Sequence, residues 1–155
     1  ADKVILGTVA YRSPSVITEI ASRFGSQAVV VSVDATISTV NRYVVICSGR
    51  LPTWLSAEVF ALEAVKRGAG ELLLQSVDRD GAMTGYDLEL LRSVRPRVEV
   101  PIILSGGCSG AADMAEALRA GADACAAGAL WTFTDLTPNE AKKELHAGGF
   151  QVRVA

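Results

Sequence analysis

The sequence predicts an α/β fold in which parallel β-strands alternate with α-helices, and three observations support this. Short apolar runs recur along the chain, and each is followed by a turn with Gly or Asp and then by an amphipathic segment of helical length. The apolar runs are continuous rather than alternating, which is typical of strands that are covered on both faces. Strands that alternate with helices form a parallel sheet with right-handed crossovers.

The chain has 155 residues, which is enough for one domain with a sizeable core. Apolar residues make up 50% of it and charged residues 21%, as in globular proteins. We therefore predict a single domain that spans residues 1–155 and contains five strand–helix units. The predicted strands are Lys3–Leu6, Ala28–Val33, Glu71–Leu74, Pro101–Leu104 and Ala122–Ala127.

Residues that start and stop helices lie between these strands. Ser13 precedes Pro14, which predicts an N-cap followed by proline at the first helical position. Thr137-Pro138-Asn139-Glu140 has the pattern of a capping box. The five predicted helices begin at Ser13, Ser56, Asp87, Ala112 and Thr137, and they end at Gly25, at Gly68, before Pro96, at Gly121 and near Gly148.

Two architectures satisfy this pattern: a segment of a (β/α)₈ barrel, or a five-stranded doubly wound sheet of the flavodoxin type. The periodicity of the sequence does not separate them. In both architectures, ligands bind at the carboxyl ends of the strands. The residues that follow each strand are therefore the candidates for a functional site.

Asp34 directly follows the apolar run 29–33 of the second predicted strand. A carboxylate at the mouth of an apolar strand is well placed for general acid or base catalysis, because partial loss of solvent raises the pKa of a carboxyl group towards neutrality. The alternative is an aspartate that only caps the following loop. Position alone does not distinguish the two interpretations.

A polar loop follows the third predicted strand and contains Ser76–Gly81 and Gly85–Asp87. Asp78 and Asp80 flank Arg79, and Gly81 and Gly85 follow them. This composition predicts a loop that orders around an anionic or hydroxyl-rich ligand. The alternative is an internal turn held by salt bridges.

Glycine-rich turns follow the fourth and fifth predicted strands. Ser105-Gly106-Gly107-Cys108 precedes a helix, and Ala126-Ala127-Gly128-Ala129 has similarly small residues. Glycine lets backbone amides approach an anion at the positive end of a helix. Two such turns on adjacent strands form a phosphate cradle in many barrels, so this pair predicts a phosphate-binding site.

The composition argues against several other classes of protein. A net charge of −2 gives no electrostatic reason to expect nucleic acid or an acidic membrane as a partner. We expect neither a membrane span, which needs roughly 20 apolar residues, nor an export leader. Cys47, Cys108 and Cys125 lack CxxC spacing, and His146 is the only histidine. We therefore expect buried free thiols in a reducing cytoplasm, and neither a metal nor a cofactor.

The loops, taken in order, resemble those of one known family. The similarity covers almost the whole chain and lies in Ala1–Val4, Phe24–Val31, Arg67–Glu71, Ser76–Gly81, Gly85–Asp87, Pro101–Gly107 and Ala120–Ala124. These ordered motifs resemble the cyclase subunit of imidazole glycerol phosphate synthase. The resemblance implies a partial (β/α)₈ TIM barrel of about five βα units, which correspond to strands four to eight of the family, with strands one to three absent.

The resemblance also implies a lyase of histidine biosynthesis that cleaves and cyclises a phosphoribulosyl ribonucleotide with ammonia. Its products would be imidazole glycerol phosphate and an aminoimidazole carboxamide ribotide. Asp34 matches one of two catalytic aspartates, and the other lies in the absent portion. The residues that match substrate-lining or phosphate-binding positions are Thr8, Asp80, Gly81, Ser105, Gly106, Gly107, Ala127 and Gly128.

A glutaminase partner is implied at the amino ends of the strands. Lys3 and Glu71 match members of a charged gate for ammonia, and Asp2 matches a residue that faces the partner. The alternatives are the sister isomerase of the same pathway and a self-associating barrel fragment without catalytic activity. The motifs 78–81 and 85–87 favour the cyclase over the isomerase.

Five parallel strands cannot close a barrel of eight. The predicted strands at the two ends, Lys3–Leu6 and Ala122–Ala127, would each leave an apolar edge unpaired. We therefore expect another chain to cover these edges. A second copy would do so, and so would a separate chain that supplies the first three strands.

Overall fold

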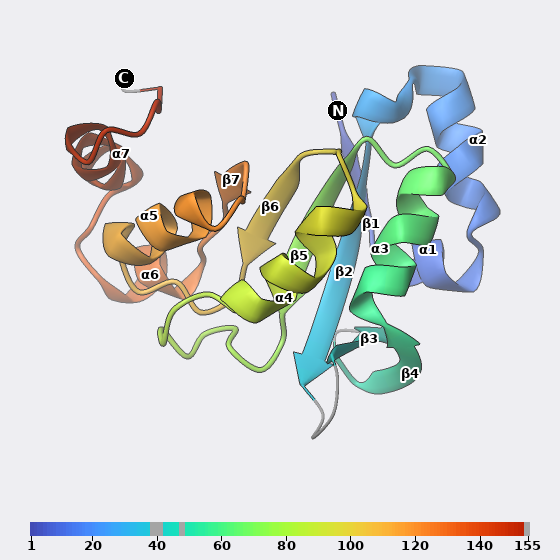
Figure 1. Ribbon diagram of the computed structural model, residues 1–155, viewed down its shortest axis with the longest axis horizontal. Coiled ribbons are helices and arrows are strands. Elements are labelled where there is room, and N and C mark those ends of the chain that lie inside the picture. Colours follow the sequence, from blue (N-terminus) through green and yellow to red (C-terminus); the bar gives the residue numbers. More distant parts are fainter. Residues whose placement is uncertain (38–41, 47–48, 154–155) are drawn as a thin grey trace.

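One sheet of seven strands, with helices packed against it, forms the framework of the computed structural model, which describes residues 1–37, 42–46 and 49–153 (Figure 1). Five of the strands are parallel and two are antiparallel. The parallel strands are β1 (Val4–Leu6), β2 (Val29–Ile37), β5 (Glu71–Ser76), β6 (Ile102–Ser105) and β7 (Ala124–Cys125). The antiparallel strands are β3 (Arg42–Ile46) and β4 (Leu51–Ser56).

The order of the parallel strands decides between the two predicted architectures. Each parallel strand pairs with the next one along the chain, from β1 through β2, β5 and β6 to β7. A flavodoxin-type sheet has the order 2-1-3-4-5, so that alternative is wrong. The chain has an α/β fold with a mainly parallel sheet, as the sequence predicts.

The helices follow the strands in alternation, with two short ones that the sequence did not predict. The unpredicted pair is α1 (Thr8–Arg12) and α6 (Ala129–Phe133). The others are α2 (Ser15–Phe24), α3 (Ala57–Lys66), α4 (Leu88–Val94), α5 (Ala111–Arg119) and α7 (Pro138–Ala147), with 3₁₀ turns η1 (Ser26–Ala28) and η2 (Arg95–Arg97).

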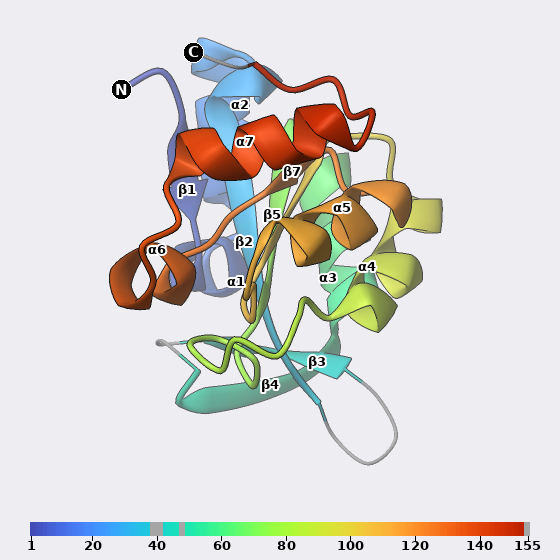
Figure 2. The ribbon, with the colours of Figure 1, turned by 90° about the vertical axis from the view of Figure 1, so that its left-hand side faces the viewer.

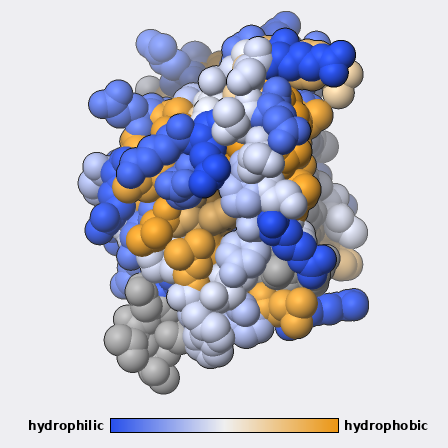
Figure 3. All heavy atoms as spheres, turned by 90° about the vertical axis from the view of Figure 1, so that its right-hand side faces the viewer, coloured by the Kyte–Doolittle hydropathy of each residue, from blue (hydrophilic) through white to orange (hydrophobic). Residues whose placement is uncertain are grey.

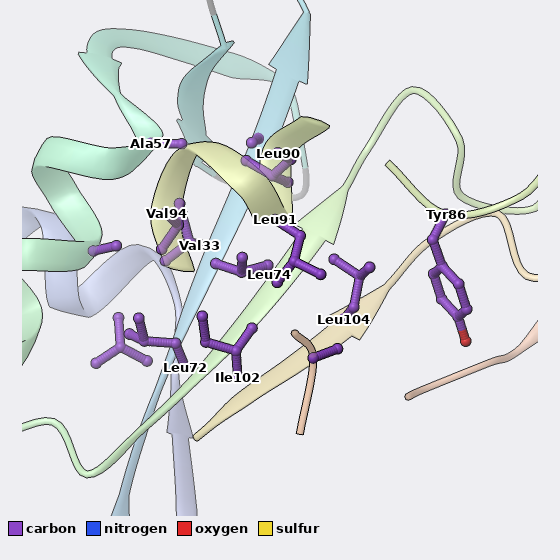
Figure 4. Packing of buried hydrophobic residues seen from close by; sticks show 14 of the residues in the cluster. Val33, Ala57, Leu72, Leu74, Tyr86, Leu90, Leu91, Val94, Ile102 and Leu104 are labelled. Atoms are coloured by element: carbon purple, nitrogen blue, oxygen red, sulfur yellow. The ribbon is translucent and has the colours of Figure 1, made fainter. Parts of the chain in front are cut away.

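The core lies between the helices and one face of the sheet. Leu72, Leu74 and Leu104 are fully buried and pack near Leu90 and Leu91 of α4 (Figure 4). Along β5, buried and half-buried residues alternate. The sequence predicted cover on both faces. Val29, Val30 and Val31 of β2 fit this prediction, because all three are buried, whereas only alternate residues of β5 are fully buried. Removing one of these leucine side chains would cost about 2–5 kcal/mol of unfolding free energy.

The hairpin of β3 and β4 was not predicted. β2 continues past the predicted end at Val33 as far as Ile37, and β3 then pairs antiparallel with its last residues. Ala35 has Val44 of β3 on one side and Ser76 of β5 on the other, so β3 uses the same edge of β2 as β1. Figure 2 shows the hairpin at the carboxyl end of β2, beside the loop after β5.

Three predicted helix caps are confirmed. The side chains of Ser56, Asp87 and Thr137 each accept a hydrogen bond from a backbone amide in the first turn of α3, α4 and α7. Thr137 forms a complete capping box with Glu140. Each cap satisfies an amide that the helix leaves without an internal partner.

The predicted cap at Ser13 is wrong. Pro14 is itself the N-cap of α2, and the structure records no side-chain hydrogen bond there. Ser13 instead ends α1, because its amide donates to the carbonyl oxygen of Val9 at 2.9 Å. The short helix α1 had no distinct signal in the sequence, so the role of Ser13 as its C-cap was not predicted.

Cys108 is a buried free thiol, as predicted. Cys125 is also free but only half-buried, and Cys47 lies outside the described residues. Within the described part of the chain, no helix has the length and apolar character to cross a membrane. The same residues contain no cluster of three or more side chains suited to a metal ion.

Candidate functional site

A row of three polar side chains crosses the sheet at the carboxyl ends of its strands. Asp34 of β2 is paired with Gln75 of β5, and Gln75 is paired with Ser105 of β6. Paired residues of neighbouring strands point to the same face of a sheet. All three are half-buried, and they lie on the face opposite the fully buried leucines. Sequence reasoning found Asp34 and Ser105 but missed Gln75.

Asp34 is an internal residue of β2, which continues to Ile37, so no loop begins at it. The interpretation of Asp34 as a cap of the following loop is therefore wrong. The hydroxyl of Ser32 donates to its Oδ1 at 2.5 Å. Because Ser32 is two residues earlier on the same strand face, this bond orients the carboxylate along the sheet. An oriented, half-buried carboxylate is suited to move a proton at a bound ligand.

Asp78 attaches the start of the loop after β5 to the end of β2. Its carboxylate accepts hydrogen bonds from the hydroxyl of Thr36 at 2.7 Å and from the amide of Ile37 at 2.7 Å. Arg79 donates from one guanidinium nitrogen to the carbonyl oxygens of Gly85 and Tyr86 at 3.1 and 3.3 Å. Hydrogen bonds of Asp78 and Arg79 therefore hold the loop after β5. In the described part of the chain, no ion pair joins two residues of this turn.

A small pocket forms where the loops after β5, β6 and β7 meet. It contains six of the residues that the sequence predicted for substrate or phosphate binding. The lining residues are Asp80, Gly81, Met83, Gly106, Gly107, Cys108, Ala127, Gly128 and Ala129. The three loops lie at one end of the sheet because their strands are parallel and adjacent.

Glycine is required where these loops touch. Gly106 has φ +92°, and a Cβ atom there would lie 2.4 Å from the carbonyl oxygen of Ser76. Glycine therefore lets the loops after β5 and β6 pack against each other. This packing keeps six of the predicted substrate- or phosphate-binding residues around one small pocket.

Thr8 and Ser105 do not line this pocket. Thr8 begins α1 directly after β1, at the same end of the sheet but on the far side of β2 from β5. Ser105 belongs to the row with Asp34, one residue before the glycine turn. The predicted residues thus form two adjacent groups, the pocket residues and the row that contains Asp34 and Ser105. Thr8 lies apart from both groups.

Lys3 and Glu71 form an ion pair at the opposite end of the sheet. Lys3 precedes β1 and Glu71 begins β5, so both lie at the amino ends of parallel strands. Asp2, which directly precedes Lys3 in the sequence, is exposed. The structure thus brings together the two residues that were predicted to form a gate.

Tyr86 connects the loop after β5 to the loop after β7, because its hydroxyl donates to the carbonyl oxygen of Ala126 at 2.9 Å. Burial raises the pKa of Tyr86, and it also raises the pKa of Cys108 and that of Cys125, the latter to about 12. All three groups stay protonated at neutral pH. Protonated thiols are poor nucleophiles at neutral pH.

Arg42 of β3 is a second residue that sequence reasoning missed. Its guanidinium donates two hydrogen bonds to Asp87, at 2.8 and 3.0 Å, and one to Glu89 at 2.8 Å. Burial favours a raised pKa for Asp87, but the Arg42 guanidinium and the Leu90 amide outweigh it and lower the pKa below its usual value. Arg42 therefore fixes the unpredicted hairpin to the start of α4.

Comparison with known proteins gives a consistent result. A family model described as "Histidine biosynthesis protein" matches residues 1–137. Several relatives are named "Imidazole glycerol phosphate synthase subunit HisF". The chain is 44% identical to that of Thermotoga sp. (strain RQ2), 46% to that of Streptomyces coelicolor and 42% to that of Pyrobaculum aerophilum, each over 154 residues. These matches cover 99% of the chain but only 61% of each relative's length.

Proposed function

Because the chain belongs to the histidine biosynthesis protein family, we propose that it carries part of the active site of an ammonia-using cyclase. The proposed reaction converts a phosphoribulosyl aminoimidazole carboxamide ribonucleotide plus ammonia into imidazole glycerol phosphate and aminoimidazole carboxamide ribotide. The observation that carries the proposal is the row from Asp34 to Ser105, which lies directly beside the glycine pocket.

Asp34 transfers the proton in this proposal, and Ser32 positions its carboxylate. The glycine pocket binds a phosphate of the substrate through backbone amides of Gly106, Gly107 and Gly128. Asp80 and Gly81 border the same pocket and contact the bound substrate. The second catalytic aspartate would come from outside residues 1–155.

We further propose that the sheet is five-eighths of a (β/α)₈ barrel. The strand order supports this, because consecutive units of a barrel lie side by side. The uncovered face supports it too: Ile5 is 61% exposed, and Leu73 and Ile103 are only half-buried. Further strands that close the barrel would bury these side chains.

A glutaminase partner would bind at the end of the sheet that carries Lys3, Glu71 and Asp2. The ion pair of Lys3 and Glu71 supports a gate there, because opposite charges can separate to admit a small neutral molecule. The whole reaction would take place in the cytoplasm.

The test uses the chain together with a fragment that holds the remaining, N-terminal part of the Thermotoga relative. The mixture receives the ribonucleotide substrate and ammonium, and formation of aminoimidazole carboxamide ribotide is followed. We expect turnover in the mixture and none with either piece alone. A folded complex of the two pieces without turnover would refute the proposed function.

The second candidate is a self-associating fragment without catalytic activity. Exposed apolar residues favour it, including Val4 and Ile5 of the edge strand, Val9 of α1, Phe24 of α2 and Val59 of α3. Figure 3 shows apolar surface on the side of the molecule that carries α1–α3. The sister isomerase is a third candidate, and turnover of its own substrate by the same mixture would identify it.

A further inference from the structure

The hairpin of β3 and β4 carries a pair of aromatic side chains, Tyr43 and Trp54, that lies outside the glycine pocket and the row with Asp34. The rings of Tyr43 and Trp54 lie 5.0 Å apart between centroids at an interplanar angle of 32°. Trp54 is 76% exposed. A tryptophan that stacks on one neighbour and is otherwise in solvent is available to a second flat partner.

The backbone holds Trp54 in an unusual conformation. Its φ is +61°, in the left-handed region that a bulky side chain rarely adopts. Strained conformations of this kind persist where the surrounding structure imposes them, and they concentrate at functional sites.

An irregularity in strand pairing imposes this conformation. Two steps along β3, from Tyr43 to Val45, correspond to four steps along β4, from Ser56 to Pro52. A β-bulge of this kind redirects a side chain and is frequent beside active sites.

Thr53 fastens the bulge. Its hydroxyl donates to the carbonyl oxygen of Val44 at 2.7 Å and accepts from the amide of Leu55 at 3.2 Å. These two bonds fix the residues on both sides of Trp54, so the exposed position of its ring is a property of the fold.

The aromatic pair lies at the same end and on the same face of the sheet as Asp34. Tyr43 is paired with Thr36, which is two residues beyond Asp34 on β2. Residues two apart on a strand share a face and are about 7 Å apart. Tyr43 therefore stands beside the candidate acid, farther out towards the mouth.

We propose that Tyr43 and Trp54 form a stacking platform for the heteroaromatic ring of the ribonucleotide whose phosphate occupies the glycine pocket. The proposal rests on the proposed function. From β3 across β2 and β5 to β6 is three strand spacings, about 14 Å, with Asp34 between the two subsites. This distance requires the extended phosphoribulosyl ribonucleotide, which has a phosphate at each end. The shorter ribotide reaches only one subsite, so it serves as a probe of the ring subsite alone. Aromatic side chains bind such rings without requiring a particular base.

The test uses tryptophan fluorescence. The sequence contains two tryptophans, and the Trp131→Phe variant leaves Trp54 as the only one. This variant is titrated with aminoimidazole carboxamide ribotide and, in parallel, with ribose 5-phosphate, which has the phosphate but no ring. We expect the ribotide to quench Trp54 and ribose 5-phosphate to leave it unchanged while still shifting the amide resonances of the glycine pocket.

Two further variants separate the ring subsite from the phosphate subsite. Trp54→Gly is expected to keep the fold, because glycine adopts a positive φ without strain. It should weaken ribotide binding about tenfold by calorimetry and leave ribose 5-phosphate binding unchanged. Tyr43→Leu should weaken ribotide binding in the same direction.

The outcomes distinguish the platform from the proposed function. Equal ribotide affinity in the parent and in both variants overturns the platform and leaves the phosphate pocket standing. If neither the ribotide nor ribose 5-phosphate binds, the platform and the phosphate pocket are both overturned. A Trp54 signal that follows protein concentration and ignores the ribotide also overturns the platform, because the ring then lies between copies of the chain.

Discussion

The amide of Gly85 donates a hydrogen bond to the carbonyl oxygen of Gly107 at 2.8 Å, so the loops after β5 and β6 meet backbone to backbone. A Cβ atom at Gly107 would lie 2.3 Å from the carbonyl oxygen of Gly85, and its φ is +97°. The candidate phosphate pocket is built on this contact, because both loops contribute to its lining.

Replacing Gly107 with alanine should therefore separate the two loops. We expect the Gly107→Ala variant to lose about 2 kcal/mol of unfolding free energy and to lose phosphate binding. Thermal unfolding and a phosphate titration monitored by NMR measure the two effects. Gly110→Ala is the matched control, because Gly110 is extended and has open space where a Cβ would lie. Unchanged unfolding free energy and phosphate binding in Gly107→Ala would contradict a close contact between the loops at Gly85 and Gly107.

Asp34→Asn keeps the size of the side chain and removes its titrating proton. In the completed protein, we expect kcat to fall by about two to four orders of magnitude, with KM little changed. Steady-state kinetics with ammonium as nitrogen donor measure this. Asp135→Asn, an exposed aspartate after α6, serves as the control. If the Asp34→Asn variant keeps most of the parent's kcat, Asp34 is not a catalytic residue.

The ion pair between Asp87 and Arg42 should make stability depend on pH. The pKa of Asp87 is lowered in the folded state, so its contribution is present above the unfolded pKa, about 3.9, and is lost as the pH falls through the folded pKa. Asp87→Asn should cost about 2 kcal/mol at pH 7 and progressively less below pH 4. Urea unfolding at several pH values measures this, with Glu89→Gln as the exposed control. If the difference in unfolding free energy between the parent and Asp87→Asn does not change with pH, the ion pair with Arg42 does not make stability depend on the ionisation of Asp87.

The uncovered sheet face and the short edge strands should lead the chain to associate with itself. Val4 and Ile5 of β1 are 39% and 61% exposed, and exposed apolar edges pair with other chains. We expect sedimentation at micromolar concentration to give at least twice the chain mass of 16.3 kDa. A monodisperse, folded monomer would refute the prediction.

Local signals in the sequence determined the five parallel strands, most helix ends and the glycine turns. Ser56, Asp87 and Thr137 cap their helices because each bond spans only three residues of chain. Asp34 could be singled out in the same way, because it follows an apolar run in a fold whose sites lie at strand ends.

Only the tertiary structure decided which residues stand beside one another. Gln75 has no local signal, and it joins the candidate site because strand register places it between Asp34 and Ser105. The hairpin of β3 and β4, with Trp54 on it, exists because β2 extends beyond β1 and leaves an edge free to pair. Register and edge pairing join residues far apart in the chain, so their free energy depends on contacts that no short stretch of sequence contains.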